Sequence, residues 1–188
     1  MPHDLKLLSL LAAATLAVAC GRASERAAAG DSAHAAPGNP AAMTVTERGI
    51  GPLRVGMTVP EASASLGGAL AAPAGTDTAG CHYVQWRGGP PGVRFLVEGG
   101  RIARVDVDST GIRTAAGAGI GDTEEQVQRL YPGRVSVTPQ KYANGHYLTV
   151  TPGAADTSYA IVFETSEGKV TRFRSGRRPQ VQYVEGCG

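Results

Sequence analysis

The chain has few of the residues on which the common functional classes depend. Aromatic residues make up 5% of its 188 residues, and the formal net charge is only +2. That charge excludes the strongly basic footprint of a nucleic-acid-binding protein. With 26 glycines and 12 prolines, the scarcity of aromatics indicates many turns and short elements rather than long helices.

Catalytic motifs are also missing from the sequence. It contains no Gly-x-Ser-x-Gly elbow, no His-Glu-x-x-His, and no pair of carboxylates beyond Glu124 and Glu125, which lie at a predicted helix start. We therefore expect no catalytic residues, no cofactor, no metal site and no enzyme. One alternative remains, a hydrolase that uses Cys81 as nucleophile with His82 or His146 as base.

The N-terminus has the pattern of an export signal. Lys6 precedes an apolar stretch of about a dozen residues (7–18), which ends in small residues and then Cys20. This pattern is typical of a secretory signal and is too short for a membrane-spanning helix. We expect the chain to be exported.

The small-residue site Ala17-Val18-Ala19 followed by Cys20 resembles the lipobox of bacterial lipoproteins. That resemblance implies a signal peptide over residues 1–19, cleavage before Cys20, and a diacylglycerol anchor on its thiol. Alanine stands at position 17 where leucine is usual, so a plain secretory cleavage nearby is the alternative. Gly21, rather than aspartate, is compatible with sorting to the outer membrane, where the protein would face the periplasm.

Two further segments follow the signal. Residues 20–45 are dominated by Ala, Gly, Ser and Pro and lack a large apolar residue before Met43, so they predict a flexible tether. Residues 46–188 are long enough for one domain with a hydrophobic core.

The three cysteines divide into an anchor and a pair. If Cys20 carries lipid, Cys81 and Cys187 remain together in an oxidising compartment, where a disulfide is expected. This bridge would pin the C-terminal end to the middle of the domain. The rival interpretation is a metal site with His82 and His146, but no metal-ligand spacing supports it.

An internal repeat organises the domain. Residues 56–62 (GMTVPEA) align with residues 121–127 (GDTEEQV), and both copies share Gly-x-Thr-x-x-(Glu/Gln)-apolar. The threonine and the Glu or Gln three residues later predict a capping box at the start of a short helix. The helices are expected to end near 67–68 and 132–133, where glycine or proline follows.

A second pair of segments predicts two hairpins. Residues 95–105 align with 163–173, and in both copies apolar and polar residues alternate around a glycine-bearing turn. Further strands are expected at 82–87, 146–151, 135–138 and 181–184.

The duplicated helix-then-strands unit predicts an α+β domain with repeats at about 48–110 and 111–188. Its largely antiparallel sheet would carry the short helices on one face and leave the other face free.

The repeated helix start followed by strands, over residues 48–175, resembles the tandem-repeat fold of the secreted β-lactamase inhibitor proteins. It is also similar to the SmpA/OmlA family, the smaller lipoprotein of the outer-membrane β-barrel assembly machinery, which carries one such unit. Both families are non-catalytic and hold another protein, so the resemblance implies a protein-binding role. It assigns no binding residue to this sequence.

Two features are candidates for a binding surface. Arg172, Arg174, Arg177 and Arg178 form a basic run, in which alternation places the first two on one strand face. A solvated face or edge protection would equally explain the run. Trp86, the only tryptophan, is either a core residue or an exposed contact anchor.

These observations predict a monomeric cell-envelope lipoprotein that binds an envelope protein. Its role would be in envelope assembly or in the inhibition of an envelope or secreted enzyme. The alternative function is binding to the cell wall or to a lipid surface.

Overall fold

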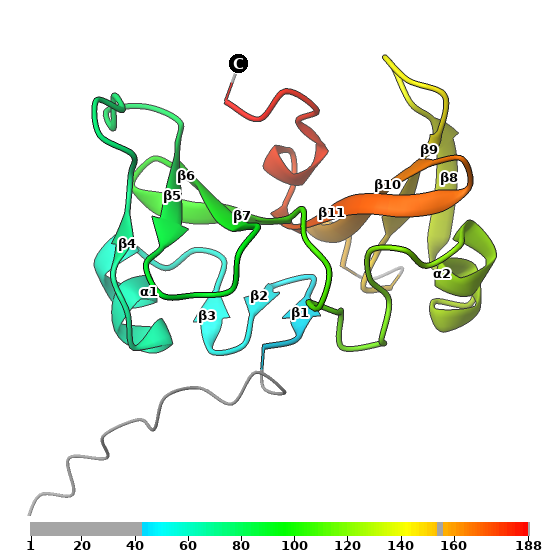
Figure 1. Cartoon of the computed structure of the whole chain (residues 1–188), viewed down its shortest axis with the longest axis horizontal. Coiled ribbons are helices and arrows are strands. Elements are labelled where there is room, and N and C mark those ends of the chain that lie inside the picture. Colours follow the sequence, from blue (N-terminus) through cyan, green and yellow to red (C-terminus); the bar gives the residue numbers. More distant parts are fainter. Residues whose placement is uncertain (1–42, 154–155, 188) are drawn as a thin grey trace, which may run out of the picture. The chain divides into compact units, whose positions relative to one another are not determined.

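The computed structural model describes residues 43–153 and 156–187, which form two antiparallel sheets and two short α-helices (Figure 1). The large sheet has eight strands in the order β4-β5-β6-β7-β11-β10-β9-β8, and the small sheet has three in the order β1-β2-β3. The elements are β1 (Val45–Thr46), β2 (Gly49–Ile50), β3 (Leu53–Arg54), α1 (Val59–Leu66), β4 (Leu70–Ala71), β5 (His82–Trp86), β6 (Val93–Glu98), β7 (Arg101–Val107), α2 (Glu124–Leu130), β8 (Val135–Pro139), β9 (His146–Val150), β10 (Tyr159–Ser166), β11 (Lys169–Arg177) and the 3-10 helix η2 (Gln180–Gln182).

The expectation of an α+β fold is wrong, because the described chain is predominantly β. Helices α1 and α2 have only eight and seven residues, whereas strands contain most of the residues in regular secondary structure. The capping boxes start both helices, but glycine and proline limit them to about two turns. The β-branched and aromatic residues that follow favour strands.

The two repeats make the same hydrogen bonds between the helix start and the hairpin turn. In the first, Gly56 N donates to Ile102 O (2.8 Å) and Ile102 N donates to Met57 O (2.8 Å). In the second, Gly121 N donates to Val170 O (2.9 Å) and Val170 N donates to Asp122 O (2.9 Å).

Each repeat supplies four consecutive strands of the large sheet. The two sets meet where β7 pairs antiparallel with β11, at the middle of the strand order. Arg104 on β7 and Arg174 on β11, which bind the C-terminal segment described below, lie on the two strands of this junction.

Both predicted capping boxes are confirmed. Thr58 caps α1 by accepting from Glu61 N, and Thr123 caps α2 by accepting from Gln126 N. The Glu61 and Gln126 side chains accept in return from the backbone amides of the two capping threonines. Thus each box satisfies amides that the helix itself leaves unpaired.

Replacing Thr123 with alanine is expected to lower the free energy of unfolding by about 1 kcal/mol, because Gln126 N loses its acceptor. Urea denaturation checks this value. Thr138→Ala is the control, since among the described residues the Thr138 hydroxyl makes no hydrogen bond and the side chain is exposed. Equal losses in the two variants would contradict the capping role.

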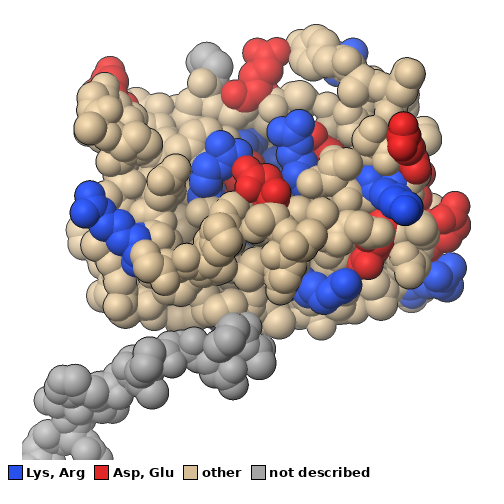
Figure 2. Space-filling view, in the orientation of Figure 1, with Lys and Arg blue, Asp and Glu red and all other residues tan. Residues whose placement is uncertain are grey.

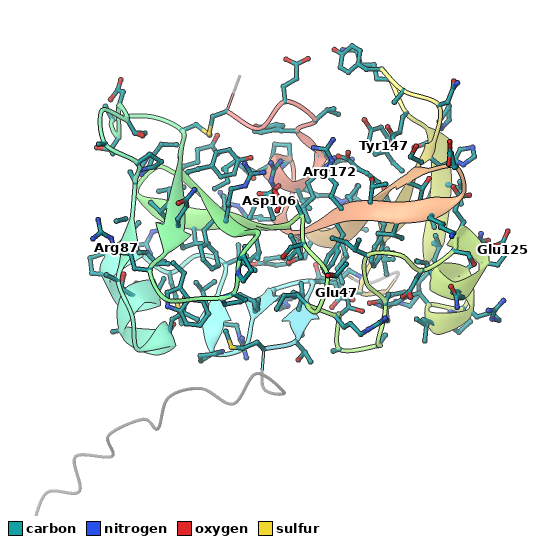
Figure 3. The ribbon with its side chains drawn as sticks, in the orientation of Figure 1. Glu47, Arg87, Asp106, Glu125, Tyr147 and Arg172 are labelled. Carbon is teal, nitrogen blue, oxygen red and sulfur yellow. A yellow bond between two sulfur atoms is a disulfide. The ribbon has the colours of Figure 1, made fainter. Side chains whose placement is uncertain are left out.

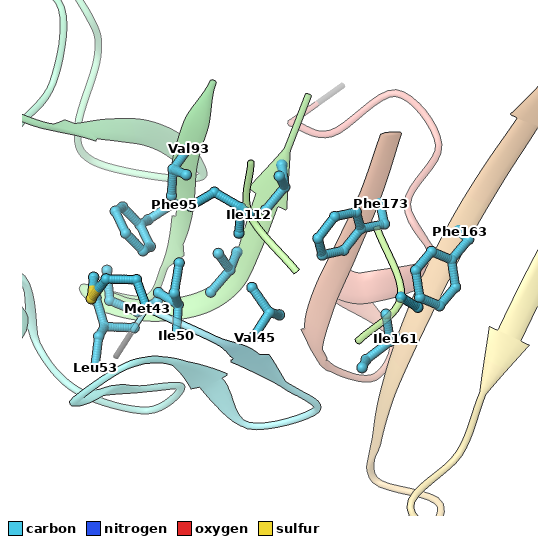
Figure 4. Close-up of a cluster of buried hydrophobic side chains, with 14 of the residues drawn as sticks. Met43, Val45, Ile50, Leu53, Val93, Phe95, Ile112, Ile161, Phe163 and Phe173 are labelled. Atoms are coloured by element: carbon cyan, nitrogen blue, oxygen red, sulfur yellow. The ribbon is translucent and has the colours of Figure 1, made fainter. Parts of the chain in front are cut away.

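The hydrophobic core lies between the large sheet and a layer made of α1, α2 and the small sheet. Figure 4 shows Phe163 and Phe173 next to each other in this core. Their ring centroids are 5.4 Å apart. Val45, Ile50 and Leu53 of the small sheet are fully buried against it. Their hydrophobic burial, worth about 1.5–3 kcal/mol for each large side chain, fixes this layer on one face of the sheet.

The folded part begins earlier than the sequence predicts. Met43 and Val45, placed in the tether that was expected to end at residue 45, are buried in the core. Val45 N donates to Arg113 O (3.0 Å), and Ala115 N donates to Val45 O (2.8 Å). The expected signal peptide and most of the tether lie outside the described residues.

The strand expected over residues 181–184 is not formed, and the free sheet face was also a wrong expectation. Residues 180–182 form η2, and this C-terminal segment crosses the face opposite the helices (Figure 1). The reason is that side chains from the sheet bind its carbonyl groups, as described below. In the described part of the chain, no helix is long and apolar enough to cross a membrane.

Candidate functional site

The C-terminal segment 179–187, here called the strap, lies across the sheet face that the core does not use. Val181 is fully buried and packs with Ala160 and Val162 in a small apolar cluster separate from the main core. This cluster fixes the first half of the strap over β10.

Arg104, on β7, holds the strap through its guanidinium. Its Nη1 donates to Gln180 O (3.0 Å) and to Tyr183 O (2.7 Å). Its Nε donates to Asp106 Oδ2 (2.9 Å), and its Nη2 donates to the Tyr83 hydroxyl. The side chain is 3% exposed, so this charge is buried and almost fully hydrogen-bonded.

Tyr83 supports Arg104 as a neutral phenol. Burial, assisted by the negative charge of Asp106, raises the pKa of Tyr83 above its ordinary value. The hydroxyl therefore keeps its proton throughout the physiological range and accepts from Arg104 without adding a charge.

Arg174, on β11, is the second buried guanidinium under the strap. Its Nε donates to Val181 O (2.6 Å), and its Nη1 pairs with Glu164 on β10. Arg172 pairs with the other oxygen of Glu164 (2.8 Å), but its own side chain is 60% exposed. The buried carboxylate of Glu164 therefore pairs with both the buried Arg174 and the exposed Arg172.

Opposite charges alternate across the central strands on this face. In the register, Arg94 on β6 lies opposite Asp106 on β7, and Asp106 lies opposite Arg174 on β11. Arg172 on β11 lies opposite Glu164 on β10. Such cross-strand pairs each stabilise a sheet by about 0.2–1 kcal/mol. Figure 2 shows the resulting mixture of basic and acidic side chains in a hollow of this surface.

A cavity of about 170 Å³ lies between these charged side chains and the strap. In Figure 3, Asp106 and Arg172 of its lining lie beside each other. Its charged lining comprises Arg94, Arg104, Arg172, Arg174, Asp106, Asp108, Glu164 and Glu185. Four arginines and four carboxylates balance, so the cavity suits charge-paired recognition rather than binding of a simple anion. It is smaller than the roughly 300–1,000 Å³ of typical small-molecule sites.

A disulfide closes the end of the strap. Cys81 and Cys187 are bonded at a sequence separation of 106, which confirms the predicted pairing. Gly186, just before Cys187, lies so close to Tyr83 that an added Cβ would be 2.6 Å from the phenol oxygen. Only glycine allows the strap to approach the sheet at this point.

Beyond Tyr183 the strap turns side chains toward solvent. Val184 is 39% exposed, and the neighbouring Tyr142, from the β8–β9 loop, is 62% exposed. Tyr142 donates to Glu185 Oε1 (2.9 Å), and the Lys141 ammonium lies 4.7 Å from the Tyr142 ring centroid. These four residues, here called the strap patch, line one shallow depression.

The structure separates the four arginines of the predicted basic run. Arg172 and Arg174 share the strap face, but Arg174 is buried and committed to the strap and Glu164. Arg177 lines another cavity, with Arg101 and Tyr159. Arg178 lines a third, on β8 and β9. The run is therefore not one basic surface.

Trp86 lies away from the strap. It is half-buried, packs against the main core, and lines an open apolar cleft with Met43 and Leu66. Gly68 and Gly89 are in contact range of its ring, since a Cβ on either would clash with it. These contacts make Trp86 primarily a packing residue.

The other sequence candidates offer no reactive group. Cys81 is in the disulfide, so the hypothetical hydrolase lacks its free thiol. Among residues 43–153 and 156–187, no three His, Cys, Asp or Glu side chains form a metal-binding group. Cys20 lies outside the described residues.

The sequence hypothesis missed Arg104, Asp106, Glu164 and Tyr83. A signal was present, because charged residues alternate with valine in 104–107 and predict a strand with one charged face. What could not be read locally is that β7 pairs with β11, which brings this face beside Arg172 and Arg174.

No protein-family model matches the chain, and no curated protein is similar to it. Its structure is distantly similar to that of the uncharacterized protein yfeY from Escherichia coli, with a TM-score of 0.41 and 17% sequence identity. The match covers 71% of this chain and 99% of that chain. It assigns no function. The resemblance to the β-lactamase inhibitor and SmpA/OmlA families stays a prediction.

Proposed function

We propose that this chain is a non-catalytic protein-binding module of the cell envelope and that the strap patch is its contact surface. The observation that carries the proposal is an anchored strap whose exposed Val184 lies beside the exposed Tyr142 of the β8–β9 loop. The strap is anchored by two buried arginines and a disulfide, yet Val184 and Tyr142 face solvent. Preorganisation of this kind reduces the entropy lost on binding.

The composition of the strap patch fits a protein partner. Tyrosine is enriched among the residues that dominate binding energies, and exposed apolar groups bordered by charges are typical of interfaces. Lys141 and Glu185 border the two apolar side chains, while Arg172 and Arg94 lie at the adjacent cavity. A partner surface with an apolar centre and mixed charges would complement this arrangement.

Location and anchoring complete the proposal. Export and lipidation at Cys20, with placement at the outer membrane facing the periplasm, are inferred from the N-terminal sequence alone. The disulfide between Cys81 and Cys187 supports an oxidising compartment. Envelope assembly and inhibition of an enzyme both remain consistent with a module that holds another protein.

Site-directed photocrosslinking in intact cells tests the contact surface. A photoreactive phenylalanine analogue at Val184 or Tyr142 is expected to give the same saturable adduct with one envelope protein. The control carries the analogue at Gln128, which is exposed on α2 on the opposite side of the sheet. Identical adducts at all three positions, or none from the strap patch, would sink the assignment.

A further inference from the structure

A second cleft, of about 400 Å³, lies over β8 and β9 and differs from the strap cavity in its chemistry. Its lining includes the hydroxyl residues Ser136, Thr138, Thr149 and Thr151, together with Arg134, Arg178 and Gln182. None of the described residues that line it is acidic. Unlike the charge-balanced strap cavity, this cleft has arginines and no carboxylate in its lining.

The strand register places the hydroxyl groups on one surface. Ser136 lies opposite Thr149 in the antiparallel β8–β9 pair. Thr138 lies two residues after Ser136 on β8, and Thr151 lies two residues after Thr149, just past the end of β9. All four side chains therefore share a face. Hydrogen bonds among the described residues engage none of these four hydroxyls, which leaves each free to donate.

Arg178 supplies the charge. It follows β11, and its backbone is fixed because Arg178 N donates to Ser158 O (2.8 Å). Gln182 is fixed beside it by the bond from Gln182 N to Pro179 O (2.8 Å). The backbone of both residues is thus fixed, and both residues line the same cleft as the hydroxyl side chains.

The guanidinium of Arg178 is uncommitted. Its Nε is buried and has no hydrogen-bond partner among the described residues. By contrast, Arg134 donates to Thr151 O (2.7 Å) and pairs with Glu47. A buried donor without an acceptor is unusual in native proteins and calls for an explanation such as a bound anion or water.

We propose that this cleft binds a phosphate group, with Arg178 as the charged donor and the hydroxyls of Ser136 and Thr149 as neutral donors. A tetrahedral oxyanion accepts hydrogen bonds from several directions, and guanidinium groups match its geometry. The phosphate could belong to a lipid head group or be a free phosphate ion, since both present the same oxygens. This inference is independent of the strap patch.

Titration with inorganic phosphate tests the site on the full chain carrying Cys20→Ser, so that no acyl group contributes. The Nε–H resonance of Arg178 is expected to shift saturably with phosphate and not with chloride at equal ionic strength. Arg178→Gln should weaken phosphate binding about tenfold or more, because it removes a charge-assisted hydrogen bond. Arg177→Gln is the matched control, since the adjacent arginine lines a different cavity and should leave the affinity within about twofold.

Ser136→Ala combined with Thr149→Val provides a variant that retains every charge. It should also weaken phosphate binding, and it keeps the test decisive if Arg178→Gln does not fold. Failure to saturate, or equal weakening by Arg177→Gln, would overturn the proposal, because either result means nonspecific attraction to positive charge.

Vesicles distinguish the two sources of phosphate. The Cys20→Ser chain is sedimented with phosphatidylcholine vesicles that contain or lack phosphatidylglycerol. Retention that needs phosphatidylglycerol, is competed by inorganic phosphate and is lost in Arg178→Gln supports a lipid head group. Saturable phosphate binding without retention supports the free ion. Retention that is unchanged in Arg178→Gln would overturn the site as the membrane contact.

Discussion

Replacing Arg104 with methionine is expected to lower the free energy of unfolding by about 3–5 kcal/mol, the usual cost of breaking a buried ion pair from one side. Few single changes in this chain should cost as much. The measurement is chemical denaturation followed by circular dichroism, with the disulfide kept oxidised.

The physical reason is the number of groups that depend on this one side chain. Without the guanidinium, Asp106 loses its partner, and the carbonyls of Gln180 and Tyr183 lose their donors. Methionine fills part of the volume but offers no N–H. Buried acceptors left without donors cost about 1–3 kcal/mol each, so the loss should exceed that of an ordinary surface substitution.

Arg101→Met is the matched control on the same strand. Arg101 is exposed and makes one side-chain hydrogen bond, to Gly56 O (2.7 Å). Its replacement should cost less than about 1 kcal/mol. If the two variants lost similar stability, the strap would not depend on Arg104, and the buried network would have no structural role.

The sequence predicts well what neighbouring residues determine. Thr58 and Thr123 cap their helices because a cap needs only the next three residues. The hairpins at 95–105 and 163–173 also form, since alternation and a glycine turn are local signals. Even the Cys81–Cys187 pairing followed from counting cysteines.

The fold class and the strap could not be predicted in the same way. The α+β expectation counted helix starts but not helix lengths, and the structure is mostly β. Residues 181–184 contain the β-branched and aromatic residues typical of a strand, yet Arg104 and Arg174 bind the carbonyls of this segment and hold it across the sheet. Tertiary contacts thus override a local pattern. The surroundings of Arg178 could not be predicted either, because the hydroxyl residues that line its cleft come together only when β8 pairs with β9.

Removal of the disulfide is the second change with a large expected effect. Cys81→Ala together with Cys187→Ala should lower the free energy of unfolding by about 4–5 kcal/mol, because the bridge closes a long loop in the unfolded chain. The sequence separation of 106 residues puts it near the upper end of the chain-entropy scale. Denaturation of both forms in a Cys20→Ser background provides the comparison.

The native strap should respond unevenly to this loss. Its first half keeps Val181 in the apolar cluster and its carbonyls on Arg104 and Arg174. Its second half keeps mainly the hydrogen bond from Tyr142 to Glu185, between exposed groups. Hydrogen exchange should therefore accelerate at the amides of residues 184–187, while the amides of Gln182 and Tyr183, which donate to Pro179 O and Gln180 O, stay protected.

The two halves give the experiment its discriminating power. If the amides of Gln182 and Tyr183 also lost their protection, the disulfide would be positioning the arginine network rather than adding to it. The strap patch would then depend on the oxidised bridge for its shape. If only residues 184–187 loosened, the buried arginines would define the sheet face by themselves. The bridge would then chiefly hold Val184 and Glu185 in the orientation from which we propose they contact a partner.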